Sequence, residues 1–195
     1  TPTTGSTLPG RAKGLHLSDD GRADAHHAAT RLVTAGSISA VYSSPLERTR
    51  ETAGAVAGAL GLKVRIDRGL LECDFGEWTG RKLSELMKLP EWRTVQQAPS
   101  TFRFPGGESF IEMQTRASAA VARLVAAHPG ERIACVSHAD PIKAVVALAQ
   151  GVHLDLFQRI VISPCSITPI AYGPGAPIVL SVNSTGDDLS GLVPS

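Results

Sequence analysis

Residues 38–61 read ISAVYSSPLERTRETAGAVAGALG. The stretch from Ile38 to Ser43 is short, apolar and rich in β-branched and aromatic side chains, which predicts a buried strand. Residues 44–47, Ser-Pro-Leu-Glu, have the pattern of a capping box with proline at the first helical position. A helix is therefore expected from there to near Gly61. A buried strand that passes directly into a helix is the repeating unit of parallel α/β sheets.

The rest of the chain continues this alternation of strands and helices. We expect helices from a Ser18 cap to about Val33, from Leu83 to Lys88, from Ser109 to about His128, and from an Asp140-Pro141 cap to Gly151. Strands are expected at Lys63 to Ile66 and at Arg132 to Ser137, with a closing hairpin of Ser166 to Tyr172 and Ile178 to Val182, and a frayed tail after Gly186. The pattern predicts a three-layer α/β sandwich with a largely parallel central sheet. We expect a single domain over residues 1–195, with a small cap insertion at 81–107.

Composition excludes several classes of partner. The 195 residues carry 19 basic and 18 acidic side chains, a formal charge of +1, so no basic surface for nucleic acid is expected. No apolar stretch approaches the roughly 20 residues that span a bilayer, so we expect no membrane segment. Three cysteines without a CxxC pair indicate reduced thiols and a cytoplasmic protein.

Two strand ends carry residues suited to binding an anion. Ligands of open α/β sheets lie beyond the carboxyl ends of the strands, where helix N-termini present free amides. Arg48 lies in the first turn of the helix that follows the first strand, and His138 lies at the end of the strand that begins at Arg132. Together they predict a small anion site. Taken singly, either residue is more often a solvated charge or a turn residue.

The segment from Leu71 to Gly80 adds three carboxylates, Glu72, Asp74 and Glu77, between aromatic residues. A carboxyl group packed among aromatic side chains has a raised pKa and suits a general acid at neutral pH. The spacing alone does not choose among the three.

Two further features have weaker functional interpretations. Arg81, Arg93 and Arg103 in the cap could bind a second anionic group of a substrate, although solvated side chains are the simpler reading. Cys135 is expected to be an inert thiol inside a strand core.

Three segments resemble the histidine phosphatase superfamily, the phosphoglycerate-mutase-like proteins. SSPLERTRETA (43–53) resembles its S-x-L-x-R-x-x-x-T-A motif, LECDFGEWTG (71–80) resembles L-x-E-x-x-F-G-x-W-x-G, and VSHADPIK (136–143) resembles its second-histidine segment. The loop TLPGR (7–11) and residues 104–109 and 151–160 are most similar to an actinobacterial branch of phosphomutase or phosphatase proteins.

The resemblance implies roles for particular residues. Arg48 would clamp the phosphate, Glu72 would donate or accept the proton, and His138 would stabilise charge on the transferring phosphoryl group. The substrate would also contact four further positions: Thr3, where the family often has asparagine, Gly10, Arg11 and Ala139, where the family has glycine.

The family's Arg-His-Gly motif, whose histidine is phosphorylated, does not occur in these residues. We expect it in a segment before Thr1, which would also supply a central strand of the sheet.

The implied function is that of a cofactor-independent phosphomonoesterase acting on a small phosphorylated metabolite, with no metal site. A phosphoglycerate mutase and a non-catalytic phospholigand-binding protein are the alternatives, and association with further copies of the chain is left open.

Overall fold

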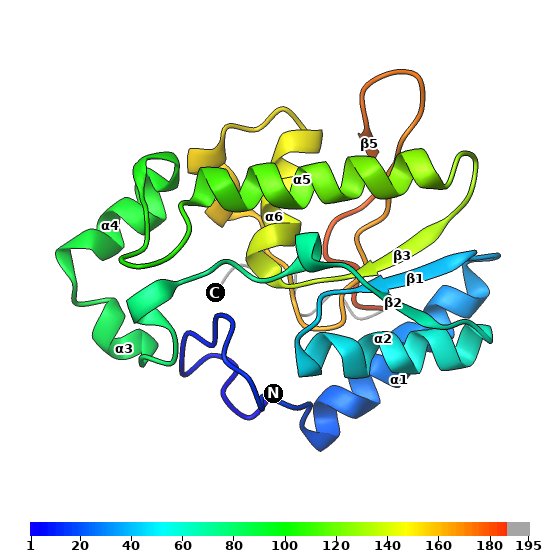
Figure 1. The fold of residues 1–195 in the computed structure, drawn as a ribbon, viewed down its shortest axis with the longest axis horizontal. Coiled ribbons are helices and arrows are strands. Elements are labelled where there is room, and N and C mark those ends of the chain that lie inside the picture. The colour runs from blue at the N-terminus through cyan, green and yellow to red at the C-terminus, as the bar shows by residue number, and fades with distance from the viewer. Residues whose placement is uncertain (187–195) are drawn as a thin grey trace.

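The computed structural model describes residues 1–186 and contains a parallel three-stranded sheet (Figure 1). β1 (Ala40–Ser43) lies at its centre, between β2 (Val64–Ile66) and β3 (Ile133–Val136). Tyr42 of β1 is in register with Arg65 on one side and Cys135 on the other. All three strands therefore end at the same edge of the sheet, as a parallel α/β fold requires.

Helices cover both faces of the sheet (Figure 1). α1 (Asp19–Thr34) and α2 (Glu47–Leu60) lie on one side, and α5 (Phe110–Ala127) and α6 (Ala139–Ala149) lie on the other. Apolar residues of β1, α1 and α2, including Val41, Ala29 and Val56, form one buried core. The predicted three-layer α/β class is confirmed.

Helix caps account for two of the helix starts. The Ser18 hydroxyl accepts a hydrogen bond from the Gly21 amide at the start of α1, as predicted. A complete capping box of Ser109 and Glu112 opens α5. Each cap satisfies amides that have no partner within the helix.

The predicted caps of α2 and α6 are wrong. α2 begins at Glu47 after Leu46, without a side-chain cap, and the hydroxyl of Ser44 lies against His138 instead. α6 begins at Ala139 with His138 in the capping position, so Asp140 belongs to its first turn. The Ser44 hydroxyl therefore belongs to the edge of the sheet and does not cap α2.

The cap insertion lies at one end of the molecule (Figure 1) and contains α3 (Leu83–Leu86) and α4 (Pro90–Gln97). The sequence did not predict α4, because proline was taken to end a helix, whereas Pro90 occupies the first turn of one. Trp78, Phe102 and Phe104 form an aromatic core beneath this cap. Short 3₁₀ helices also occur at Arg68–Leu70, Gly76–Trp78, Pro99–Thr101 and Leu154–Arg159.

The closing hairpin is present but shorter than predicted. β4 (Ile170–Ala171) and β5 (Ile178–Val179) pair antiparallel and form a separate two-stranded sheet. β3 is thus an edge strand within residues 1–186, and Cys135 is exposed there, contrary to the expected core position. The tail after Gly186, expected to be frayed, lies outside the described residues. No helix in the described range is long and apolar enough to cross a membrane.

Candidate active site

Arg48 and His138 meet at the carboxyl edge of the sheet. The first turn of α2 supplies Arg48 and the junction of β3 with α6 supplies His138. The Arg48 Nη2 atom lies 3.1 Å from His138 Nδ1 and donates a second hydrogen bond to the Gly10 carbonyl at 2.9 Å. Both side chains are buried. The two strand ends therefore form one site, with a guanidinium and an imidazole in direct contact.

The hydrogen bonds of His138 fix its tautomer. A guanidinium can only donate, so His138 Nδ1 accepts from Arg48 and the ring proton is on Nε2. Nε2 lies 2.8 Å from the Ser44 hydroxyl, to which it donates. Burial, and then the positive charge of Arg48, keep the pKa of His138 well below its ordinary value. The imidazole is therefore neutral at physiological pH, and its single N–H is held by Ser44.

Glu72 is the third buried polar group of this site. Its Oε2 lies 4.0 Å from His138 Nδ1, and its Oε1 accepts a hydrogen bond from the Cys73 amide. Burial, reinforced by the charge of Asp140, raises the pKa of Glu72 to about 8. Glu72 therefore carries a proton at neutral pH, as a general acid must.

The other two carboxylates of the segment lie elsewhere. Asp74 forms an ion pair with Arg11, and Glu77 is exposed. Burial therefore distinguishes Glu72 from the other two carboxyl groups, among which the sequence could not choose a candidate general acid.

Donors without partners converge on the same site. Arg48 Nη1 is buried and makes no hydrogen bond within residues 1–186. The amide of Ala139 starts α6, where the helix offers it no acceptor and the helix dipole favours negative charge. Unpaired buried donors are costly unless a ligand satisfies them. Arg48, His138 and the end of α6 therefore have the character of a binding site for a tetrahedral anion.

Comparison with known proteins shows the family of the chain. The model of the histidine phosphatase superfamily (branch 1) matches residues 3–185. The chain belongs to this superfamily. It is 35% identical over 161 residues to a bifunctional protein of Mycobacterium tuberculosis, covering 82% of this chain but 44% of that protein. The chain thus spans less than half the length of this relative.

Two further proteins resemble the chain over most of their length. Phosphoserine phosphatase 1 of Hydrogenobacter thermophilus is 31% identical over 181 residues, which are 90% of this chain and 85% of that protein. The structure of a mycobacterial glucosyl-3-phosphoglycerate phosphatase superposes with a TM-score of 0.81 at 25% identity, and 92% of each chain is covered. These similarities confirm the predicted family and support its phosphatase class.

Within this histidine phosphatase fold, a network of charged residues that the sequence did not reveal holds the Glu72 segment. Arg116 of α5 donates to the carbonyls of Gly69 and Leu71 and pairs with Glu108 through two nitrogens. Arg11 donates to the Glu72 carbonyl at 2.9 Å and also pairs with Glu108. Arg11 and Arg116 thus fix the backbone that carries Glu72. Their partners are far apart in the sequence, so no local pattern indicates them.

The remaining candidates occupy different places. Gly10 approaches Arg48 through its carbonyl, and a Cβ there would lie 2.8 Å from Thr79 Oγ1, so the close approach requires glycine. Thr3 makes its hydrogen bonds within residues 1–7, and none to the three site residues. A role for Thr3 in substrate binding stays a prediction.

No three metal-ligating side chains converge anywhere in the described part of the chain. Although part of Cys135 is exposed, protein atoms around its thiol and the charge of Asp67 raise the pKa of that thiol to about 12, so it is protonated and a poor nucleophile at neutral pH.

Arg116→Met tests the bracing network. The substitution leaves the carbonyls of Gly69 and Leu71 without their charged donor and leaves Glu108 with Arg11 alone, so we expect the free energy of unfolding to fall by about 2–3 kcal/mol. Urea unfolding followed by circular dichroism measures it. The control is Arg103→Met, which removes an exposed ion pair with Glu112 and should change stability little. Equal losses in the two variants would contradict a bracing role for Arg116.

Proposed function

We propose that the protein is a phosphomonoesterase that acts on small phosphate esters without a cofactor, through a phosphohistidine intermediate. The observation that carries the proposal is the buried guanidinium of Arg48, with Nη1 unpaired, beside the neutral imidazole of His138. A planar guanidinium binds two oxygens of a phosphate at once, and the Ala139 amide adds a further donor. Family membership supports the same chemistry.

In the proposed reaction, a histidine nitrogen attacks phosphorus and the bond from phosphorus to the ester oxygen breaks. The leaving alkoxide takes the proton of Glu72, whose raised pKa keeps it protonated until that step. Water then attacks the phosphohistidine, Glu72 accepts a proton from it, and inorganic phosphate leaves. Arg48 and the Ala139 amide stabilise the charge on the equatorial oxygens, and His138 joins them when its Nε2–H turns from Ser44 to the phosphoryl group.

The nucleophile in this proposal is the histidine of the superfamily's Arg-His-Gly motif, which does not occur among the 195 residues. His138 is not the nucleophile in this proposal, because its Nδ1 accepts a hydrogen bond from Arg48 and its Nε2 carries the proton. The proposal is therefore to be tested on the protein expressed from its complete gene.

The test separates the phosphatase from its two alternatives. Phosphate release from p-nitrophenyl phosphate and benzyl phosphate is measured in EDTA, alongside interconversion of 3- and 2-phosphoglycerate in a coupled assay. We expect phosphate release and negligible interconversion, because a phosphatase admits water to the phosphohistidine and a mutase excludes it. Mutase turnover without phosphate release would identify a mutase. Phosphate binding without either activity would identify a non-catalytic binding protein.

A further inference from the structure

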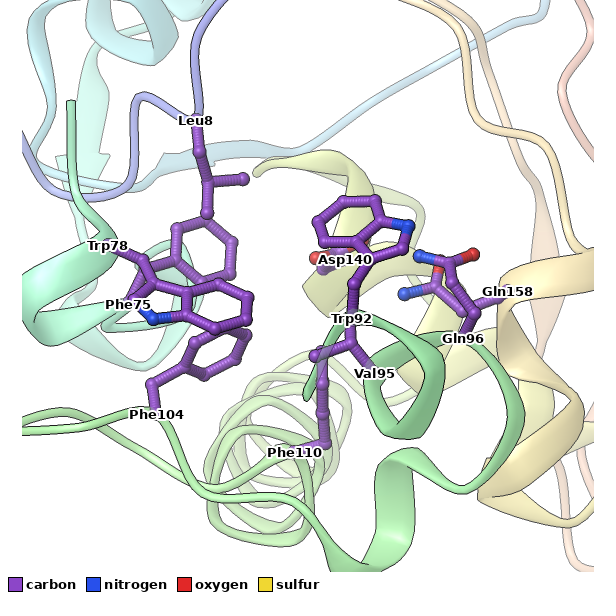
Figure 2. A pocket seen from close by; sticks show the side chains of 10 residues that line it. All are labelled: Leu8, Phe75, Trp78, Trp92, Val95, Gln96, Phe104, Phe110, Asp140 and Gln158. Carbon is purple, nitrogen blue, oxygen red and sulfur yellow. The ribbon is translucent and has the colours of Figure 1, made fainter. Parts of the chain in front are cut away.

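A cavity of about 160 Å³ is lined by residues that are close along the chain to the phosphate-binding donors. Asp140, which lines it, is in the first turn of α6, two residues after His138. Leu8 lines the opposite part, two residues before Gly10, whose carbonyl Arg48 binds. Figure 2 shows both side chains turned toward the same space. Through Leu8 and Asp140 the cavity is connected to the anion site, and it is the candidate place for the alcohol part of a phosphate ester held by Arg48.

Half of the residues that line the cavity are aromatic. Trp78 and Phe104 lie on one side and Trp92 of the cap on the other (Figure 2). Trp78 and Phe104 are in edge-to-face contact, with ring centroids 5.4 Å apart, and both are buried. Such contacts fix the rings before any ligand binds, so the wall offers a preformed surface for a flat apolar group.

The polar part of the wall is acidic or neutral. It consists of Asp140, Gln96 and Gln158, and no lysine or arginine is among the described residues that line the cavity. Lys143 bonds to Asp140 Oδ1 at 3.3 Å and to Gln158 at 3.2 Å, but it lies outside the lining. Asp140 and Lys143 thus form an ion pair with similarly exposed side chains, of which only the carboxylate belongs to the cavity lining.

The arginines of the cap do not add positive charge to the cavity wall. Arg93 is exposed and bonds to Gln97, while Arg103 is paired with Glu112. Arg81 is not part of the wall. The sequence-based idea that these arginines bind a second anionic group has no support in the cavity.

We infer that this cavity selects phosphate monoesters of aromatic alcohols that are neutral or cationic, and discriminates against alcohols that carry a second anionic group. The inference rests on the proposed phosphomonoesterase function and names its substrate class. A ring would pack against the edges of Trp78 and Trp92, which are stacked with their centroids 6.4 Å apart and leave no room for a ring between them. A carboxylate on that ring would be brought toward Asp140 with no lining cation to offset the repulsion, whereas an ammonium or hydroxyl group could bond to it.

Three benzyl phosphates that differ only in the para substituent test the charge preference. The substituents are hydrogen, aminomethyl and carboxyl, and they are too far from the ester oxygen to alter the leaving group strongly. With protein from the complete gene at pH 7, we expect kcat/KM for the carboxyl ester to be at least tenfold below that for the aminomethyl ester. Equal values, or a faster carboxyl ester, would overturn the inference.

Two variants assign the preference to its residues. Asp140→Asn should reduce the ratio between the aminomethyl and carboxyl esters several-fold, whatever it does to the absolute rates. Trp92→Ala should raise KM for benzyl phosphate while leaving KM for ethyl phosphate nearly unchanged, because only the benzyl ring reaches the aromatic wall. An unchanged ratio in the first variant, or equal changes of KM in the second, would contradict the assignment.

The outcome also separates this inference from the proposed function. Hydrolysis of ethyl and p-nitrophenyl phosphate without any preference among the benzyl esters would refute the cavity's role alone. Hydrolysis of no ester would refute the phosphatase. In that case binding of the three corresponding benzylphosphonates, measured by calorimetry, decides the inference. The same order of affinities supports it and equal affinities overturn it.

Discussion

Replacing Arg48 by methionine should lower kcat/KM for every phosphate ester by about 10²–10³-fold, the usual consequence of losing a preorganised donor to transition-state charge. The effect should not depend on the alcohol, because Arg48 would contact the phosphoryl oxygens that all substrates share. Arg48→Lys should recover little of the activity, since an ammonium cannot bind two oxygens in the geometry of a guanidinium.

Arg50→Met is the matched control for this prediction. Arg50 lies two residues further along α2 but is exposed, so the variant removes the same charge from the same helix without touching the site. Its kcat/KM should stay near that of the wild type. Similar losses in the Arg48 and Arg50 variants would mean that general attraction of the anion, and not a defined contact, supports activity.

Glu72→Gln should have an effect that depends strongly on the leaving group. Benzyl alkoxide is a poor leaving group and needs the proton of Glu72, so kcat/KM for benzyl phosphate should fall by about 10²–10⁴-fold. The p-nitrophenolate ion leaves without a proton, and its ester should lose far less. In the wild type, kcat/KM for benzyl phosphate should decline as the pH rises through about 8, where Glu72 loses its proton. Equal losses for both esters would contradict the role of Glu72 as the acid.

The same variant should gain stability at alkaline pH. Burial raises the pKa of Glu72 from its ordinary value of 4.5 to about 8, so the folded protein holds a proton that the unfolded chain releases. Stability from this group is complete below pH 4.5 and is lost as the pH rises toward 8. Glutamine has no such ionisation. Thermal unfolding should show Glu72→Gln to be more stable than the wild type at pH 8.5 and similar to it at pH 5, and the opposite pattern would contradict a buried, protonated Glu72.

The elements that could be predicted from the sequence are those whose signals act within a few residues. The Ser18 cap and the apolar run before Ser43 lead directly to α1 and β1. Pro90 misled the prediction of α4, because proline fits the first turn of a helix as well as the position after its end. Ser44 failed as a predicted cap because its hydroxyl bonds to His138, which is 94 residues away.

The features of the site likewise fall into those that the local sequence indicates and those that only tertiary contacts reveal. The positions of Arg48 and His138 at strand ends could be inferred from the alternation of strands and helices, since parallel strands bring their carboxyl ends together. The choice of Glu72 over Asp74 as the candidate general acid required knowing which carboxyl group is buried, and the spacing of the residues in the sequence does not show this. The bracing by Arg116 and Glu108 required the packing of α5 against the Glu72 segment. Tertiary contacts of this kind leave no local pattern.

The most direct test of the proposed chemistry is rapid acid-free quenching of the complete-gene protein during turnover of benzyl phosphate in EDTA, with the phosphate isotopically labelled. The mechanism predicts label bound to the protein at up to one phosphate per chain. The bond should be labile to acid and stable to base, as a phosphohistidine is, and the label should be greatly reduced in Arg48→Met. Sustained release of phosphate with no labelled protein at any time, or label stable to acid, would contradict it.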